Sequence, residues 1–283
     1  MKVLVTGSSG YCGIGIVRVL LAHGYSVVGF SLDGQDESLG NPQFISVLGD
    51  LTNFAAIYNS LEGVDAVVHA AIGSRVHRET PPVSPGDRPR PDFTLVTPFN
   101  INVDGAFNVF EAARQRRIHK VVNLSSGAVI YHHIIDPLDN HIHRVKVNAD
   151  TAPAVRGDYG ITKLLQEQIG CYYASHYGLS VPTLRPWWVI DGETGLTRLG
   201  HRLEDDPIDA LGSAGWVDRC DLGEAVRLGL EQDIAYGIFY IAATASSDDF
   251  FDLEPTRRVL RWQPAYRFEA EVQVRKQKGM DPY

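Results

Sequence analysis

The sequence has few cysteines, no long apolar run and no excess of basic residues. Its three cysteines, Cys12, Cys171 and Cys220, are odd in number and widely spaced, which argues against a disulfide framework and a zinc ribbon. No run approaches the ~18 apolar residues that a membrane span requires. The formal net charge of -8 argues against a nucleic-acid partner, because neutralising phosphates requires a basic surface. We therefore expect reduced thiols, no membrane contact and no nucleic acid.

The length and composition are those of an ordinary globular protein. The 283 residues, 44% hydrophobic and 21% charged, suffice for one large α/β domain or for a nucleotide-binding domain with a small appendage. Met1 and Lys2 lead directly into an apolar segment, and nothing there resembles a signal peptide. We expect a cytoplasmic protein.

A glycine-rich turn follows the first apolar segment. Val3 to Val5 read as a short buried strand, Gly7, Gly10 and Gly13 are spaced G-x-x-G-x-x-G, and residues 14–23 have helical apolar periodicity. Glycines let the backbone turn tightly and approach a pyrophosphate, whose charge is attracted by the N-terminal end of the helix. A strand, glycine turn and helix in this order predict a dinucleotide site.

The next strand, residues 26–30, should end near a group that contacts the adenosine ribose. An acidic residue in this place accepts the ribose hydroxyls. Asp33 lies 20 residues beyond Gly13, but Ser31 competes for the same position. Because either residue could occupy the position that contacts the ribose, we expect NAD as the cofactor and keep NADP as the alternative.

Strand-like and helix-like segments then alternate along the chain. This order predicts a doubly wound parallel sheet with a small C-terminal cap. We expect a dinucleotide-binding domain over residues 1–184 and a small substrate-binding region, interwoven with the main sheet, over 185–283. The further expected strands are 44–48, 65–71, 121–124, 181–184 and 238–242, and the further helices are 53–61, from 102 onward, 159–177 and 221–231.

Residues 73–98 interrupt the alternation with six prolines and several arginines, among them Arg75. Prolines at this density cannot form a central strand or helix. Such a long loop is either a solvated excursion or a lid whose arginines approach an anionic substrate.

Tyr159 and Lys163 stand four residues apart in a predicted helix, after Ser125, Ser126 and Gly127 have closed an earlier strand. Residues i and i+4 share a helix face, so the phenol and the ammonium point the same way. A tyrosine has an ordinary pKa of about 10, and a neighbouring cation stabilises its phenolate. Because a tyrosine and a lysine four residues apart also occur by chance, the catalytic interpretation of this pair depends on the order of the motifs along the chain.

With these motifs in this order, the chain resembles the extended short-chain dehydrogenase/reductase superfamily, in its NAD(P)-dependent epimerase/dehydratase group. The resemblance implies a Rossmann fold and covers nearly the whole chain. Its motifs are Gly7-x-x-Gly10-x-x-Gly13, Gly49-Asp50-Leu51, His69-Ala70-Ala71, Asn102 to Gly105, Ser125-Ser126, Tyr159-x-x-x-Lys163, Arg185-Pro186, Val217-Asp218 through Glu224-Ala225, and Leu260-x-Trp262-x-Pro264.

The resemblance assigns roles position by position. Tyr159 becomes the catalytic acid/base, Lys163 lowers its pKa and holds the nicotinamide ribose, and Ser126 bonds the reacting oxygen. Asp218 and Trp262 are left as structural residues. The family also commonly forms homodimers through two long helices, here residues 102–117 and 159–177. The expected cofactor-binding residues are Gly7, Gly10, Tyr11, Cys12, Gly13, Asp33, Asp50, Leu51, Ala70, Ala71, Asn102, Tyr159, Lys163 and Pro186.

The substrate is expected to be small. Residues 191–215, which separate two apolar segments, look too short to hold a nucleotide sugar. In length and in its C-terminal tail the chain resembles uronate dehydrogenases, which bind a carboxylate through an arginine about a dozen residues after the position of Arg185. Arg198 lies 13 residues on, one out of register, and a bidentate arginine suits a carboxylate.

We therefore predict an oxidoreductase acting on a small sugar or sugar acid, with Arg198, Gly127, Trp187 and Arg75 as substrate residues. Trp187 is equally compatible with core packing and with a wall for a sugar ring. The 33-residue spacing from Ser126 to Tyr159 is longer than usual, which leaves the exact substrate open. The alternatives are a nucleotide-sugar epimerase or dehydratase, and a non-catalytic nucleotide-sensing regulator.

The long segment before Tyr159 contains four histidines, at positions 132, 133, 141 and 143. Clustered imidazoles can bind a metal ion. No cysteine or matched acidic set completes a site in the sequence, so we expect no metal.

Overall fold

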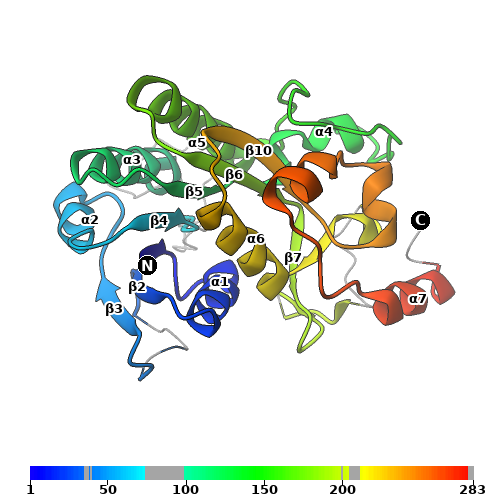
Figure 1. Ribbon diagram of the computed structural model, residues 1–283. Helices are drawn as coiled ribbons and strands as arrows, with labels where there is room; N and C mark the ends of the chain where they lie inside the picture. Colours follow the sequence, from blue (N-terminus) through cyan, green and yellow to red (C-terminus); the bar gives the residue numbers. More distant parts are fainter. Residues whose placement is uncertain (35–37, 39, 74–98, 199, 204–210, 280–283) are drawn as a thin grey trace, which may run out of the picture.

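A seven-stranded sheet organises the protein, whose computed structural model describes residues 1–34, 38, 40–73, 99–198, 200–203 and 211–279 (Figure 1). The strand order is β10-β6-β5-β4-β1-β2-β3, and every neighbouring pair is parallel. This confirms the predicted doubly wound sheet. The strands are β1 (Lys2–Thr6), β2 (Ser26–Ser31), β3 (Phe44–Leu48), β4 (Ala66–His69), β5 (Val121–Leu124), β6 (Val181–Pro186) and β10 (Tyr236–Ile241).

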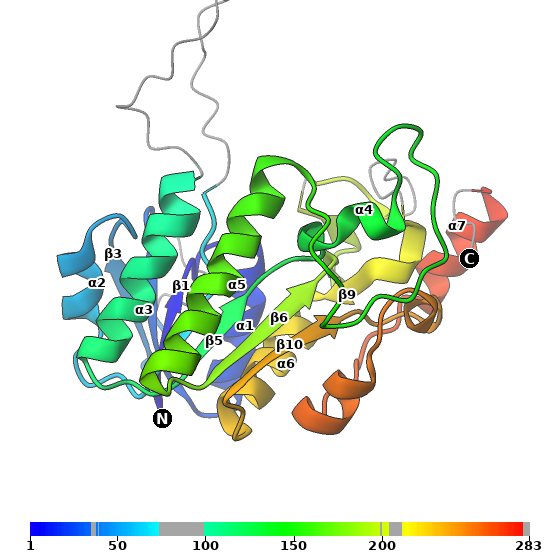
Figure 2. The same cartoon turned by 90° about the horizontal axis from the view of Figure 1, so that it is seen from above.

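Helices cover both faces of the sheet, because alternate strand residues point to opposite sides. Val3 and Val5 of β1 pack with residues of α1 (Tyr11–Ala22) and α6 (Arg219–Glu231), whereas Leu4 packs on the other side. That other face carries α2 (Phe54–Ser60), α3 (Gly105–Gln115) and α5 (Gly157–Tyr177), and Figure 2 shows α3 and α5 side by side.

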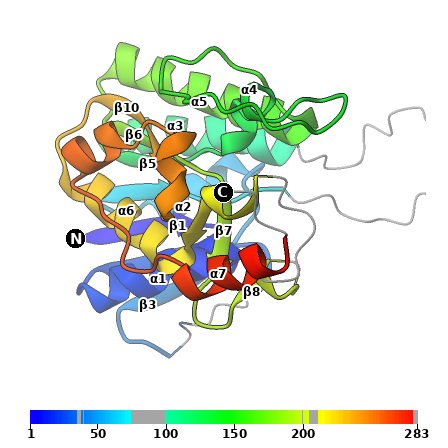
Figure 3. The same cartoon turned by 90° about the vertical axis from the view of Figure 1, so that its right-hand side faces the viewer.

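The C-terminal region adds a second, three-stranded sheet in the order β8-β7-β9. Its strands are β7 (Trp188–Asp191), β8 (Leu196–Thr197) and β9 (Trp216–Asp218), and helix α7 (Glu269–Gln277) lies beside them in Figure 3. The same region returns to the main sheet as α6 and β10. The shorter helical segments are α4 (Tyr131–Ile134) and single turns at Asn100–Asp104, Gly127–Val129, Gly212–Gly215, Ala245–Asp249 and Thr256–Leu260.

Helices α1 and α6 approach each other backbone to backbone. A Cβ added at Gly15 would lie 2.4 Å from the carbonyl oxygen of Arg219, and one added at Gly223 would lie 2.8 Å from that of Gly15. Both distances are below van der Waals contact, so only glycine permits this packing. The first helix after the glycine turn is thereby locked to the first helix after β9.

Asp218 and Trp262 have the structural roles expected of them. The Asp218 carboxylate caps α6 by accepting from the backbone N–H of Cys220 at 2.7 Å and of Asp221 at 3.2 Å. The buried Trp262 indole donates to the carbonyl oxygen of Asp221 at 2.9 Å. In the part of the chain that the structure describes, no helix is long and apolar enough to span a bilayer.

Candidate active site

A cleft of about 1510 Å³ opens where the parallel strands of the main sheet end. Gly7 follows β1, Ser31 ends β2, Ala70 follows β4, Ser126 follows β5 and Pro186 ends β6. Ligands of open α/β sheets bind at this carboxyl edge. Other predicted residues that line the cleft are Gly10, Tyr11, Cys12, Gly13, Asp33, Asp50, Leu51, Ala71, Tyr159, Lys163, Trp187 and Arg198.

The glycine turn is shaped to receive a diphosphate. Gly7 has a φ of 70°, in the left-handed region, and its N–H donates to the carbonyl oxygen of Phe30 at 2.7 Å. A Cβ on Gly13 would lie 2.0 Å from the carbonyl oxygen of Gly7. The turn therefore packs tightly onto the start of α1, whose free N–H groups face the cleft side of the turn. Burial raises the pKa of the Cys12 thiol to about 11, so it stays protonated at neutral pH.

A buried hydroxyl that the sequence analysis missed joins β1 to β4. Thr6 Oγ1 accepts from the N–H groups of Ala70 and Ala71, each at 3.2 Å, and lies 2.9 Å from His69 Nδ1. Burial lowers the pKa of His69 to about 3, so the imidazole is neutral at neutral pH. The only sign of this contact in the sequence was a polar residue, Thr6, at the end of an apolar strand.

Both candidates for the adenosine ribose line the cleft, in different surroundings. The exposed Asp33 carboxylate accepts from Ser9 Oγ at 2.7 Å, beside the glycine turn. Ser31 is buried, and within the described residues its hydroxyl has no hydrogen-bond partner.

The three residues with predicted catalytic roles meet in the cleft. Helix α5 places Tyr159 in its first turn and Lys163 one turn later, and the Tyr159 phenol is hydrogen-bonded to Ser126. Lys163 Nζ donates to the carbonyl oxygen of Leu124 at 2.6 Å and to Gln166 Oε1 at 2.9 Å, and lies 6.0 Å from the centre of the Tyr159 ring. Helix α5 thus supplies two of the groups, and the turn that follows β5 supplies Ser126.

Burial dominates the electrostatics of these groups. Loss of water around the hydroxyl raises the pKa of Tyr159 to about 12, although the residue as a whole is 40% exposed, because this effect outweighs the hydrogen bond with Ser126 and the nearby positive charge of Arg198, both of which lower the pKa. Burial lowers the pKa of Lys163 to about 8. The cation that acts on the tyrosine in this arrangement is Arg198, since Lys163 is turned toward Leu124. The pKa-lowering role of Lys163 stays a prediction.

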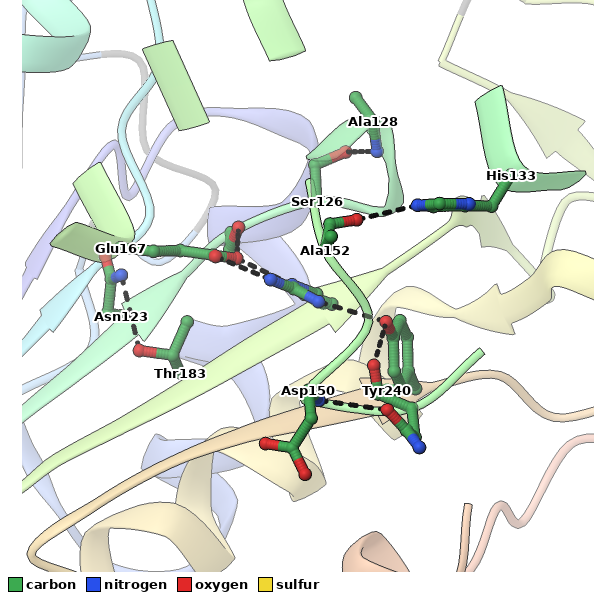
Figure 4. A network of polar contacts seen from close by, with 12 residues as sticks. Asn123, Ser126, Ala128, His133, Asp150, Ala152, Glu167, Thr183 and Tyr240 are labelled. Atoms are coloured by element: carbon green, nitrogen blue, oxygen red, sulfur yellow. Dashed lines mark hydrogen bonds and ion pairs between the residues drawn. The ribbon is translucent and has the colours of Figure 1, made fainter. Parts of the chain in front are cut away.

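A buried ion pair between Arg185 and Glu167 lies next to the segment that carries Ser126 (Figure 4). Glu167 accepts two hydrogen bonds from the guanidinium of Arg185, each at 2.7 Å, and a third from Ser125 Oγ at 2.5 Å. Arg185 also donates to the Tyr240 hydroxyl at 3.0 Å, which in turn donates to the carbonyl oxygen of Asn148 at 3.0 Å. The network therefore links α5, β6 and β10 to the end of β5, where Ser125 precedes Ser126.

One part of the cleft wall is aromatic. The indole of Trp187 stacks on the Tyr131 ring, with centroids 5.2 Å apart and planes 6° from parallel, and the Arg156 guanidinium lies 4.4 Å from the centre of the same ring. A Cβ on Gly127 would lie 2.3 Å from the indole, so Gly127 makes room for Trp187. Sequence reasoning missed Tyr131 and Arg156, which stand in a segment without periodicity.

Among the predicted site residues, Asn102 and Gly127 do not line the cleft. Asn102 is buried, and its amide accepts from the Gly73 N–H at 2.7 Å and donates to Thr162 Oγ1 at 3.0 Å. It lies behind the lining of the cleft, where it ties the end of the β4 segment to α5. Arg75, with residues 74–98, lies outside the described residues.

The histidine-rich segment forms local contacts. The rings of His141 and His143 lie 5.3 Å apart, and His143 Nε2 lies 3.5 Å from an Asp136 carboxylate oxygen. His133 Nε2 lies 2.7 Å from the carbonyl oxygen of Ala152. Across the described ranges, no three or more His, Cys, Asp or Glu residues gather as a metal site would require.

Comparisons with known proteins agree with this arrangement. The model of the NAD dependent epimerase/dehydratase family matches residues 3–84 and 91–193. L-arabinose 1-dehydrogenase (NAD(P)(+)) of Haloferax volcanii is 25% identical over 93% of this chain and 96% of its own length. Uronate dehydrogenase of Pseudomonas putida is 26% identical over 65% of this chain and 59% of its own.

Among solved structures, glucuronic acid dehydrogenase from Chromohalobacter salexigens shares the fold with a TM-score of 0.73 at 19% identity, covering 98% of this chain and 89% of that one. The family match spans more than half of the sequence and includes the glycine turn, Ser126, Tyr159 and Lys163. This protein therefore belongs to the NAD dependent epimerase/dehydratase family.

Proposed function

We propose that this protein is an NAD(P)-dependent oxidoreductase that interconverts a hydroxyl and a carbonyl group on a small sugar or sugar acid. The observation that carries the proposal is the meeting of Ser126, Tyr159 and Lys163 in one cleft, with the charge of Arg198 acting on Tyr159. The dehydrogenase names of its relatives support it.

In the direction of oxidation, Tyr159 removes the proton from the reacting substrate hydroxyl, and Ser126 holds the same oxygen by a hydrogen bond. A bound nicotinamide supplies the redox chemistry by accepting the hydride. Lys163, held by its contacts with Leu124 and Gln166, is the residue we assign to the nicotinamide ribose. In the reverse direction Tyr159 returns the proton.

We assign Arg198 to the substrate carboxylate and Trp187 to one face of the sugar ring. An arginine binds a carboxylate through two parallel hydrogen bonds. Trp187 and Tyr131 line the cleft and present a flat apolar surface, which suits the carbon-bound hydrogens of a sugar ring. We assign most of the substrate contacts to the region from residue 185 onward and the cofactor to residues 1–184, with Tyr131 of the latter adding to the surface for the sugar.

For the cofactor we propose NAD, bound with its adenosine ribose at Asp33. The Asp33 carboxylate lies at the glycine turn and is positioned by Ser9. Its negative charge accepts hydrogen bonds from a ribose diol and repels the phosphate of NADP.

The assay that tests this function measures the absorbance of reduced nicotinamide with a panel of uronates, aldoses and aldonates, each with NAD and with NADP. We expect turnover of at least one sugar acid or aldose, with the lower KM for NAD, and a smaller difference between the cofactors in Asp33→Asn. No turnover across the panel, together with tight binding of a UDP- or GDP-sugar in calorimetry, would replace the proposal with an epimerase or dehydratase.

We further propose a homodimer formed through the outer face of α3 and α5. Phe107, Tyr172 and Tyr177 on these helices are 48%, 44% and 46% exposed, an apolar and aromatic surface that a partner would cover. Sedimentation equilibrium should give twice the chain mass, and a monomer at micromolar concentration would contradict the proposal. A cytoplasmic location stays a prediction.

A further inference from the structure

We propose that Tyr11 is a positioning residue, which transmits the placement of the glycine turn to the hairpin that carries Arg198. The inference rests on the proposed function, because it takes Arg198 as the group that binds the substrate anion. It adds a link between the two ends of the cleft that neither the predicted roles nor the family match assigns.

Arg198 stands at the tip of a short hairpin. Leu196 pairs with Arg202 in antiparallel fashion, the Thr197 N–H donates to the carbonyl oxygen of His201 at 2.9 Å, and the Leu203 N–H donates to that of Gly195 at 3.0 Å. These bonds fix the course of the chain on both sides of the tip. The base of the hairpin, residues 195–197 and 201–203, therefore sets the direction in which Arg198 points.

Tyr11 holds that base. Its hydroxyl donates to the carbonyl oxygen of Leu196 at 2.7 Å, and burial raises the pKa of the phenol, which keeps the donated proton in place. The guanidinium of Arg219 lies 5.8 Å from the centre of the Tyr11 ring and 3.0 Å from an Asp191 carboxylate oxygen. Asp191 in turn accepts from Thr194 Oγ1 at 2.8 Å, at the start of the same hairpin.

The other side of the hairpin is anchored independently. The buried Arg275 of α7 donates to the carbonyl oxygen of Leu203 at 3.1 Å, and its guanidinium lies 5.5 Å from the centre of the Trp216 ring. Of the two side chains that hold the hairpin, Tyr11 and Arg275, the arginine lies far from the glycine turn. Tyr11, by contrast, is the first residue of α1, directly at the site of the diphosphate.

A ligand that orders the glycine turn therefore also orders the carbonyl group of Leu196 and, through Thr197, Arg198. Coupling of this kind is reciprocal, so nucleotide binding raises the affinity for the substrate anion and the anion raises the affinity for the nucleotide. The phenylalanine variant keeps the ring and loses only the hydroxyl bond, which contributes about 1 kcal/mol, or roughly a fivefold change in affinity.

The test compares Tyr11→Phe with Tyr25→Phe. The control also loses a tyrosine hydroxyl bond of 2.7 Å, here to Glu231 near the turn between α1 and β2, away from the cleft. For Tyr11→Phe we expect the KM for the sugar acid to rise about fivefold, with kcat within twofold of the unmodified protein, and we expect the sugar acid to lose its strengthening effect on the binding of NAD. Tyr25→Phe should leave all three quantities as they are in the unmodified protein.

A second measurement needs no substrate. Hydrogen exchange followed by mass spectrometry should show faster exchange over residues 191–198 in Tyr11→Phe than in Tyr25→Phe, and NAD should slow this exchange only in proteins that retain Tyr11. Unchanged exchange in Tyr11→Phe overturns the inference, as does faster exchange with an unchanged KM. If no sugar acid is turned over, the proposed function fails, while the exchange experiment still decides whether Tyr11 links the turn to the hairpin.

Discussion

Replacing Tyr159 with phenylalanine should lower kcat/KM by about 10²- to 10⁴-fold, the usual contribution of a positioned acid or base. The variant keeps the ring and removes only the hydroxyl that exchanges the proton with the substrate and bonds to Ser126. Initial rates of NAD reduction measure the loss. Calorimetry should show that the variant still binds NAD, because the change leaves the glycine turn and Lys163 in place.

The pH dependence gives a second readout of the same residue. With its pKa raised to about 12, Tyr159 is protonated at neutral pH, and the fraction of phenolate grows about tenfold for each pH unit below that value. Oxidation by the unmodified protein should therefore accelerate with pH through the neutral and mildly alkaline range, and residual oxidation by Tyr159→Phe should not. A variant rate within tenfold of that of the unmodified protein would remove Tyr159 from the mechanism.

Replacing Glu167 with alanine should lower the free energy of unfolding by about 3–5 kcal/mol, the cost of leaving one member of a buried ion pair alone. Arg185 is only 3% exposed and would lose both charge-assisted hydrogen bonds, while Ser125 would lose its acceptor. Urea denaturation followed by circular dichroism measures the loss.

The matched control is Glu224→Ala, which removes an ion pair within α6 whose carboxylate side chain is 30% exposed. A pair of this kind contributes only about 0–1 kcal/mol. The double variant Glu167→Leu with Arg185→Met should recover much of the stability, because no unpaired charge remains buried. If Glu167→Ala is no more destabilising than Glu224→Ala, the buried network does not support the site as described.

The parts of the cleft that were predictable from sequence are those in which neighbouring residues interact. The glycine turn is one such case, since the spacing of Gly7, Gly10 and Gly13 constrains the backbone directly. Tyr159 and Lys163 are another, because helical periodicity alone puts them on one face. The parallel sheet followed from the regular alternation of strands and helices, which the strand pairing confirms.

The remaining parts depend on contacts between distant segments. Tyr131 reaches the cleft only because an irregular segment folds back over Trp187, and no periodicity marks such a path. Asn102 was placed at the cofactor by resemblance, whereas its amide is satisfied by Gly73 and Thr162. The bond from Tyr11 to Leu196 joins residues 185 positions apart, which no local pattern reveals.

The glycine contact between α1 and α6 also limits how molecules enter and leave the cleft. Backbones that meet at Gly15 and Gly223 leave no slack for one helix to slide or rotate against the other. The strand β10 further ties the C-terminal region into the main sheet beside β6. Moving the two halves of the chain apart would break both contacts. We therefore expect the halves to stay together throughout a catalytic cycle, with cofactor and product exchanging through movements of the segments at the entrance of the cleft.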